Sequence, residues 1–194
     1  MTDSEDKSKK NDKAGNITEQ LVFQSRFVHI FGEIDHASAQ ATSERLIALS
    51  QESDAPIYVL ISSPGGHVES GDAIHDMIRF INAPVTTIGT GWVASAGTLI
   101  FLAAPLERRI CLPNTRFMIH QPSGGAGGQS TDIAIQAKEM VRIRERVARI
   151  IAKQTEKPVE KVLVDMERDF WMDAKEAIAY GIVSKIIERH DELQ

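Results

Sequence analysis

The chain has 194 residues, 42% of them hydrophobic and 25% charged, with a formal net charge of −5 at pH 7. This length suits one domain with a full hydrophobic core, and the acidic balance gives no basic field for a phosphate backbone, which argues against nucleic acid as a partner. The single cysteine, Cys111, has no internal partner for a disulfide and so favours a reducing compartment, the cytoplasm.

Residues 1–13 alternate lysine with acidic residues and contain no apolar run that could act as a secretory signal. We expect residues 1–16 to form a disordered tail or a propeptide and residues 17–194 to form a single domain. The longest apolar stretch, Trp92 to Pro105, is about fourteen residues long, whereas a membrane-spanning helix needs roughly twenty. It is therefore interpreted as a buried core helix, and no membrane association is expected.

The next part of the chain predicts alternating strands and helices. The predicted strands cover residues 27–31, 57–62 and 85–90, and the predicted helices cover residues 38–50, 70–81 and 94–104. The second strand is continuously apolar, as expected when helices cover both faces of a parallel sheet. Gly91 is expected to end the third strand. Two further strands, 109–112 and 116–120, flank the turn-forming pair Pro113-Asn114.

The C-terminal part predicts mainly helices after the glycine-rich segment 124–128. The longest helix should begin near residues 130–132, where Ser, Thr and Asp can all act as N-caps. Its apolar stripe comprises Ile133, Ala137, Met140, Ile143, Val147 and Ile150. Pro158 suits the first position of another helix. Asp173 can cap a last helix that Gly181 ends, and residues 182–187 should form a strand, so that repeated βα units predict an α/β fold.

Ser95 is a candidate nucleophile because it stands where a predicted strand turns into a helix. Its immediate neighbours in the segment Ala94-Ser95-Ala96-Gly97 are too small to block a substrate. The backbone N–H of Ala96, at the start of the helix, is available to stabilise an oxyanion. The alternative is that Ser95 serves only as a helix N-cap.

A serine needs a base, and His120 lies at the end of a predicted strand that faces the loops. A histidine in this position can also be a hydrogen-bonded core residue. The base in turn needs an acceptor that fixes its tautomer, and Asp169, beside two aromatic residues, is the candidate. A structural ion pair between Asp169 and Arg168 is the alternative.

Two glycine segments complete the candidate residues. Gly65 and Gly66 follow a buried strand, where glycine allows backbone to approach a ligand, as a second oxyanion donor would; a tight turn is the alternative. The segment 124–128 lacks the lysine of a nucleotide-binding loop, so no nucleotide site is expected. Neither an HExxH motif nor paired cysteines occur in the sequence, so no metal is expected.

The order serine, histidine, aspartate differs from that of α/β-hydrolases, in which the acid precedes the histidine and a glycine stands where Val93 is here. Six motifs carry a different resemblance. They are Ser63-Pro-Gly-Gly66, Gly91-Trp-Val-Ala-Ser95-Ala-Gly97, Cys111-Leu-Pro-Asn-Thr-Arg116, Met118-Ile-His120-Gln-Pro122, Gln129-Ser-Thr-Asp-Ile133 and Glu167-Arg-Asp169. Together, over about residues 27–188, they resemble the proteolytic subunits of the Clp protease family (ClpP), as do the separations between the three candidate residues.

The resemblance implies an α/β ClpP/crotonase-like fold with repeated ββα units and a long handle helix. It implies a serine endopeptidase that cleaves unfolded polypeptides to short peptides inside a barrel, without a cofactor. The catalytic residues would be Ser95, His120 and Asp169. The oxyanion hole would be formed by Gly66 and Ala96, and the substrate would lie beside Gly65, Gly124 and Gly125.

The resemblance also implies a homo-oligomer of heptameric rings stacked as a tetradecamer, served by a separate AAA+ Clp unfoldase that uses ATP. Residues 124–129 would lie at the ring-to-ring contact, and Arg168 would couple ring assembly to the placement of Asp169. Three departures leave docking to an unfoldase undecided. The segment 15–26 lacks the family's axial-gate motif, Leu60 stands where many relatives have tyrosine, and Ala126 replaces a larger residue.

Two other functions remain open at this stage. The chain can be a weakly active ring subunit that needs a ClpP paralogue, which the altered N-terminal segment and the altered residue 126 suggest. A crotonase-like acyl-CoA enzyme shares the general architecture by analogy alone.

Overall fold

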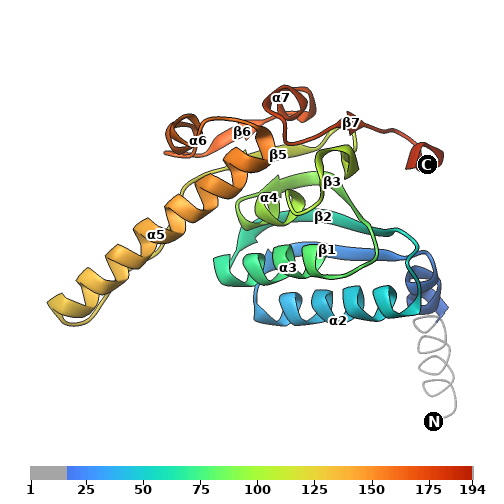
Figure 1. Cartoon of the computed structure of the whole chain (residues 1–194), viewed down its shortest axis with the longest axis horizontal. Coiled ribbons are helices and arrows are strands. Elements are labelled where there is room, and N and C mark those ends of the chain that lie inside the picture. The colour runs from blue at the N-terminus through green and yellow to red at the C-terminus, as the bar shows by residue number, and fades with distance from the viewer. Residues whose placement is uncertain (1–16, 194) are drawn as a thin grey trace, which may run out of the picture.

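The structure is a computed structural model that describes residues 17–193 (Figure 1). The tail or propeptide expected at residues 1–16 lies outside the described residues, and the single-domain prediction stays a prediction. Residues 17–24 are helical. Among the helices of the described range, none has the length and hydropathy that crossing a membrane requires.

A parallel sheet forms the centre of the molecule. Its strand order is β1-β2-β3-β4-β7. These strands are β1 (Phe27–Ile34), β2 (Ile57–Gly66), β3 (Val85–Ala94), β4 (Arg109–Cys111) and β7 (Lys185–Ile186). The strand β5 (Arg116–Ile119) also pairs in parallel with β3, and it pairs antiparallel with β6 (Phe170–Met172). The predicted α/β class is confirmed.

Helices cover the sheet and supply much of the core. They are α2 (His36–Glu52), α3 (Val68–Phe80), α4 (Ala96–Phe101), α5 (Ser130–Thr155), α6 (Val159–Asp165) and α7 (Ala174–Tyr180). The apolar stripes of α2 and α3 bury Leu46, Leu49 and Ile74 completely, in one cluster with Val59 and Ile61 of β2. Along β2 these buried residues alternate with Tyr58 and Leu60, which are only partly buried, so the expectation that β2 is buried on both faces was wrong.

The prediction that Gly91 ends the third strand was wrong. β3 continues to Ala94, and Gly91 adopts a φ of +60°, which glycine tolerates without steric cost. Before this residue, positions 87–89 pair with β4, and after it positions 92–94 pair with β5. Gly91 therefore redirects the strand from one partner to another, and this change of partner carries β3 on toward Ser95.

Several predicted boundaries also needed correction. The helix α4 ends at Phe101, and the expected strand at 182–187 shrinks to β7. Gln129, rather than one of residues 130–132, holds the N-cap position of α5, and Pro158 is the N-cap of α6 rather than its first residue. The strand β6 was not predicted. The cap of α7 at Asp173 and its end at Gly181 are confirmed.

The helix α5 projects from the body (Figure 1). Its C-terminal half is packed, since Val147, Ala148 and Ile151 are buried. At the other end of the predicted stripe, Ile133 is 41% exposed. The stripe is therefore a real apolar face, but only part of it packs within this chain.

Candidate active site

Ser95 lies in a sharp turn between β3 and α4. Its φ of +55° is uncommon for a residue other than glycine, and its backbone N–H donates to Met118 O at 2.9 Å. It holds the N-cap position of α4, but its side chain makes no capping hydrogen bond. The alternative that the hydroxyl only caps the helix is therefore wrong. A strained turn of this kind costs free energy and is typical of functional sites.

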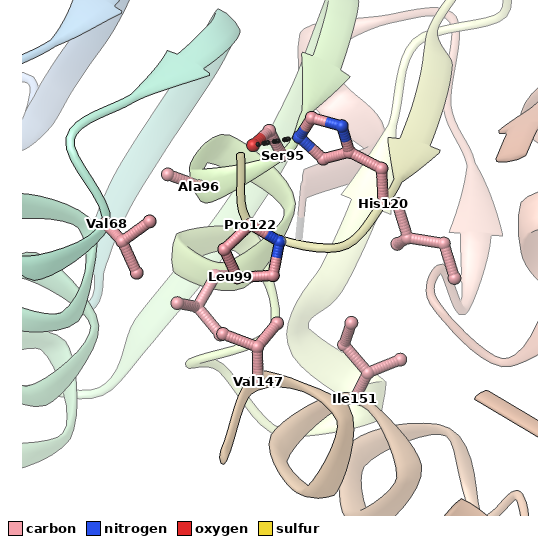
Figure 2. A pocket seen from close by; sticks show the side chains of 9 residues that line it. Val68, Ser95, Ala96, Leu99, His120, Pro122, Val147 and Ile151 are labelled. Atoms are coloured by element: carbon pink, nitrogen blue, oxygen red, sulfur yellow. Dashed lines mark hydrogen bonds between the residues drawn. The ribbon is translucent and has the colours of Figure 1, made fainter. Parts of the chain in front are cut away.

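His120 lies beside this serine because β3 and β5 are neighbours in the sheet. The pairing of Ala94 with Met118 brings the ends of both strands together. The distance from His120 Nε2 to Ser95 Oγ is 2.8 Å, so the hydroxyl can donate to the imidazole (Figure 2). The structure thus brings together the serine and the histidine that the sequence singled out.

Asp169 completes a chain of three side chains. Its Oδ1 lies 3.1 Å from His120 Nδ1, and the aspartate side chain is 62% exposed against 24% for the histidine. The acceptor expected for the histidine is therefore in place. The site stays open to solvent at this end.

The loop that carries Asp169 is held on two sides. Gln121 donates through its backbone N–H to Met166 O at 2.6 Å and through Nε2 to Glu167 O at 2.9 Å. Arg144 of α5 donates to the Glu167 carboxylate at 2.8 Å. Neither support was predicted from the sequence, although the position of Gln121 directly after His120 was a usable signal.

The two glycines that end β2 pack closely, Gly65 against the serine turn and Gly66 against the end of β1. A Cβ on Gly65 would lie 2.6 Å from Ser95 Cβ, and one on Gly66 would lie 2.2 Å from Ile34 O. Both residues have positive φ, so the tight-turn interpretation is confirmed, while the approach to a ligand stays a prediction. The Gly65 N–H donates to Ser63 Oγ at 3.0 Å and is therefore already engaged.

A small apolar pocket opens beside Ser95 and His120 (Figure 2). It is lined by Val68, Ala96, Leu99, Ile119, Pro122, Val147 and Ile151 together with the serine and the histidine. This pocket was not predicted from the sequence. The pattern that could have indicated it is the C-terminal part of the apolar stripe of α5, where Val147 lines the pocket as well as the core.

The remaining candidate residues lie outside the hydrogen-bonded chain of Ser95, His120 and Asp169. Gly124 approaches α5, since a Cβ there would lie 2.9 Å from Met140 Cε, and Gly125 has open space around it. Burial raises the pKa of Cys111 to about 11, so this thiol is no rival nucleophile. Within residues 17–193 no three His, Cys, Asp or Glu side chains gather in a way that could hold a metal ion.

Serine, histidine and carboxylate joined in this order beside a pocket define a class, the serine hydrolases that act by acyl transfer. The comparisons with known proteins narrow this class. Residues 8–190 match the model of the Clp protease family, and the chain belongs to that family.

The similar proteins carry consistent names. ATP-dependent Clp protease proteolytic subunit 3 of Rhizobium meliloti (strain 1021) is 51% identical over 185 residues, which are 95% of each chain. Subunit 2 of Gluconobacter oxydans (strain 621H) is 56% identical over 178 residues, 91% of this chain and 80% of that one. The structure of ClpP1 from Listeria monocytogenes superposes with a TM-score of 0.83 at 48% identity, covering 91% of this chain and 99% of the other.

These findings confirm the expected family, the ClpP fold and the serine endopeptidase activity. They give no support to the acyl-CoA alternative. The dependence on a paralogue stays untested.

Proposed function

We propose that Ser95, His120 and Asp169 cleave peptide bonds by acyl transfer. Ser95 Oγ attacks the scissile carbonyl while His120 Nε2 takes its proton and passes it to the leaving amine. Water then enters, loses a proton to the same nitrogen and releases the acyl group from Ser95. Asp169 orients the imidazole and stabilises its cationic form. The hydrogen-bonded chain from Ser95 through His120 to Asp169 is the observation that supports this proposal.

The oxyanion would be stabilised by the backbone N–H groups of Gly66 and Ala96. The N–H of Ala96 belongs to the first turn of α4, where no intrahelical acceptor exists. Of the two glycines, Gly66 is favoured because Gly65 already donates to Ser63. Each donor of this kind contributes on the order of 10² to 10³ in kcat.

The substrate would be an unfolded polypeptide with an apolar side chain before the scissile bond. The pocket beside Ser95 is lined almost entirely by aliphatic side chains, which favours such a residue over a charged one. The backbone at Gly65, Gly124 and Gly125 would lie along the extended substrate.

The family implies oligomeric rings that work with Clp ATPases, and we propose heptameric rings stacked as a tetradecamer with an AAA+ Clp unfoldase as partner. The exposed half of α5 supports a contact between copies, since Ile133, Ile135 and Val141 are 41%, 63% and 55% exposed there. A mixed barrel with a ClpP paralogue would use the same surface.

The test is hydrolysis of a fluorogenic peptide by the purified chain and by two variants, with the mass of the assembly measured in the same samples. Ser95→Ala should lower kcat by on the order of 10⁶, and adding His120→Ala should cost little more, because the members of a triad act as one unit. Peptidase activity that survives Ser95→Ala would contradict the proposal. Activity that appears only after a paralogue is added would favour the mixed barrel.

A further inference from the structure

An ion pair lies next to the substrate pocket and joins two of its walls. Val68 of α3 lines one side of the pocket, and Val147 and Ile151 of α5 line another (Figure 2). Asp72 lies one turn after Val68 on α3, and Arg146 directly precedes Val147 on α5. Arg146 Nη1 donates to Asp72 Oδ2, which links the two walls directly.

The two helices are otherwise separated here by an open groove. Glu69 and Asp72 line it from α3, and Glu139, Arg142, Ile143 and Arg146 line it from α5. The Asp72 side chain is 17% exposed and that of Arg146 is 43% exposed, so the carboxylate is largely removed from water. A partly buried carboxylate depends on its partner more strongly than a carboxylate on an open surface does.

The other ion pairs of α5 have different geometries. Arg149 pairs with Glu145 and Arg142 pairs with Glu139 within the same helix, while Arg144 reaches Glu167 beside the catalytic loop. Among the ion pairs of residues 17–193, the pair of Asp72 with Arg146 is the one that connects α5 to α3. Its loss would free the α5 wall to move relative to the α3 wall.

We propose that Asp72 and Arg146 are positioning residues that set the width of the pocket and thereby select the size of the apolar side chain before the scissile bond. This inference rests on the proposed function of the pocket. Neither side chain lines the pocket, so each acts through its neighbour, Asp72 through Val68 and Arg146 through Val147. A difference of one methylene in an apolar pocket already changes kcat/KM by about 10- to 200-fold, so a small change in width is measurable.

The experiment compares fluorogenic peptides that differ only in having Ala, Leu or Phe before the scissile bond. Asp72→Asn and Arg146→Gln should each change the Phe-to-Ala ratio of kcat/KM by roughly three- to tenfold, mainly through KM. The exchange Asp72→Arg with Arg146→Asp should restore the ratio. Arg149→Gln is the matched control, because it removes a charge from the same helix without touching α3, and its ratio should equal that of the wild type.

Ionic strength gives a second measurement. Salt screens an ion pair that is partly open to water. Raising the salt concentration should therefore move the Phe-to-Ala ratio of the wild type and of Arg149→Gln toward the ratio of Asp72→Asn. The ratio of Asp72→Asn itself should stay constant. Mass measurement of each variant shows whether its assembly is intact.

Two results would overturn the role of the pair. One is a size ratio that Asp72→Asn and Arg146→Gln leave unchanged, and the other is a changed ratio that the exchange does not restore. The proposed function is tested separately, by the loss of cleavage expected in Ser95→Ala. Cleavage that survives in that variant would contradict the catalytic assignment, whatever the ratio does.

Discussion

Replacing Gly65 with alanine tests whether the end of β2 holds the serine in place. The new Cβ would lie 2.6 Å from Ser95 Cβ, 3.0 Å from Ala94 O and 3.1 Å from Ala96 N, so the serine turn or the glycine turn must shift. The φ of +97° adds backbone strain of about 1–2 kcal/mol for a residue with a Cβ. Because a displacement of about 1 Å at a catalytic group can cost about 100-fold, we expect kcat/KM to fall by roughly 100-fold or more.

Gly32→Ala is the matched control for this variant. Gly32 also has a positive φ, of +80°, but its Cβ would meet no atom within 4 Å, so this variant suffers the backbone strain without the collision. Peptide hydrolysis, the rate of labelling by a fluorophosphonate and the thermal unfolding midpoint are measured for both. Both should unfold at a lower temperature than the wild type, and only Gly65→Ala should lose activity and labelling. Equal activity in the two variants would refute the reasoning that close packing against Gly65 positions Ser95.

Three further experiments test other parts of the structure. The His67 side chain caps α3 by accepting a hydrogen bond from Ser70 N. His67→Ala should therefore lower the free energy of unfolding, measured in denaturant, by about 1 kcal/mol. His67→Asn should keep most of this stability, because asparagine also caps helices. Cys111 is buried and its pKa is raised to about 11, so at pH 8 iodoacetamide should label the folded chain far more slowly than the unfolded one, and equal rates would contradict its burial. Arg144→Gln releases Glu167 and should lower kcat about three- to tenfold with little change in KM; a change in KM alone would argue against its support of the catalytic loop.

Ser95 and His120 could be singled out as candidates because each depends on local pattern. A small-residue turn at the end of a strand and a histidine at the end of another are visible along the chain. Their proximity could not be predicted in the same way, because β3 changes partners at Gly91 and only its last residues pair with β5. A glycine in a strand pattern was interpreted as the end of the strand, whereas its positive φ here serves to bend it.

The pocket was missed for a different reason. The apolar positions of α5 predict a buried face but not what covers each part of it. Val147 and Ile151 of this face line the pocket, while Ile133, farther out, is 41% exposed. Residues of one periodic pattern therefore lie in the core, line the pocket or form an exposed surface. Periodicity alone does not separate these three environments.

This division of α5 links the catalytic residues to whatever covers its outer half. Asp169, the most exposed of the three, sits on a loop whose Glu167 is held by Arg144, and Arg144 lies between the packed and the projecting parts of the helix. A shift of the projecting part would pass through Arg144 and Glu167 to the Asp169 carboxylate, which lies 3.1 Å from His120 Nδ1. The contact proposed between copies would cover the exposed half of α5. It would thereby also restrain the loop that carries Asp169.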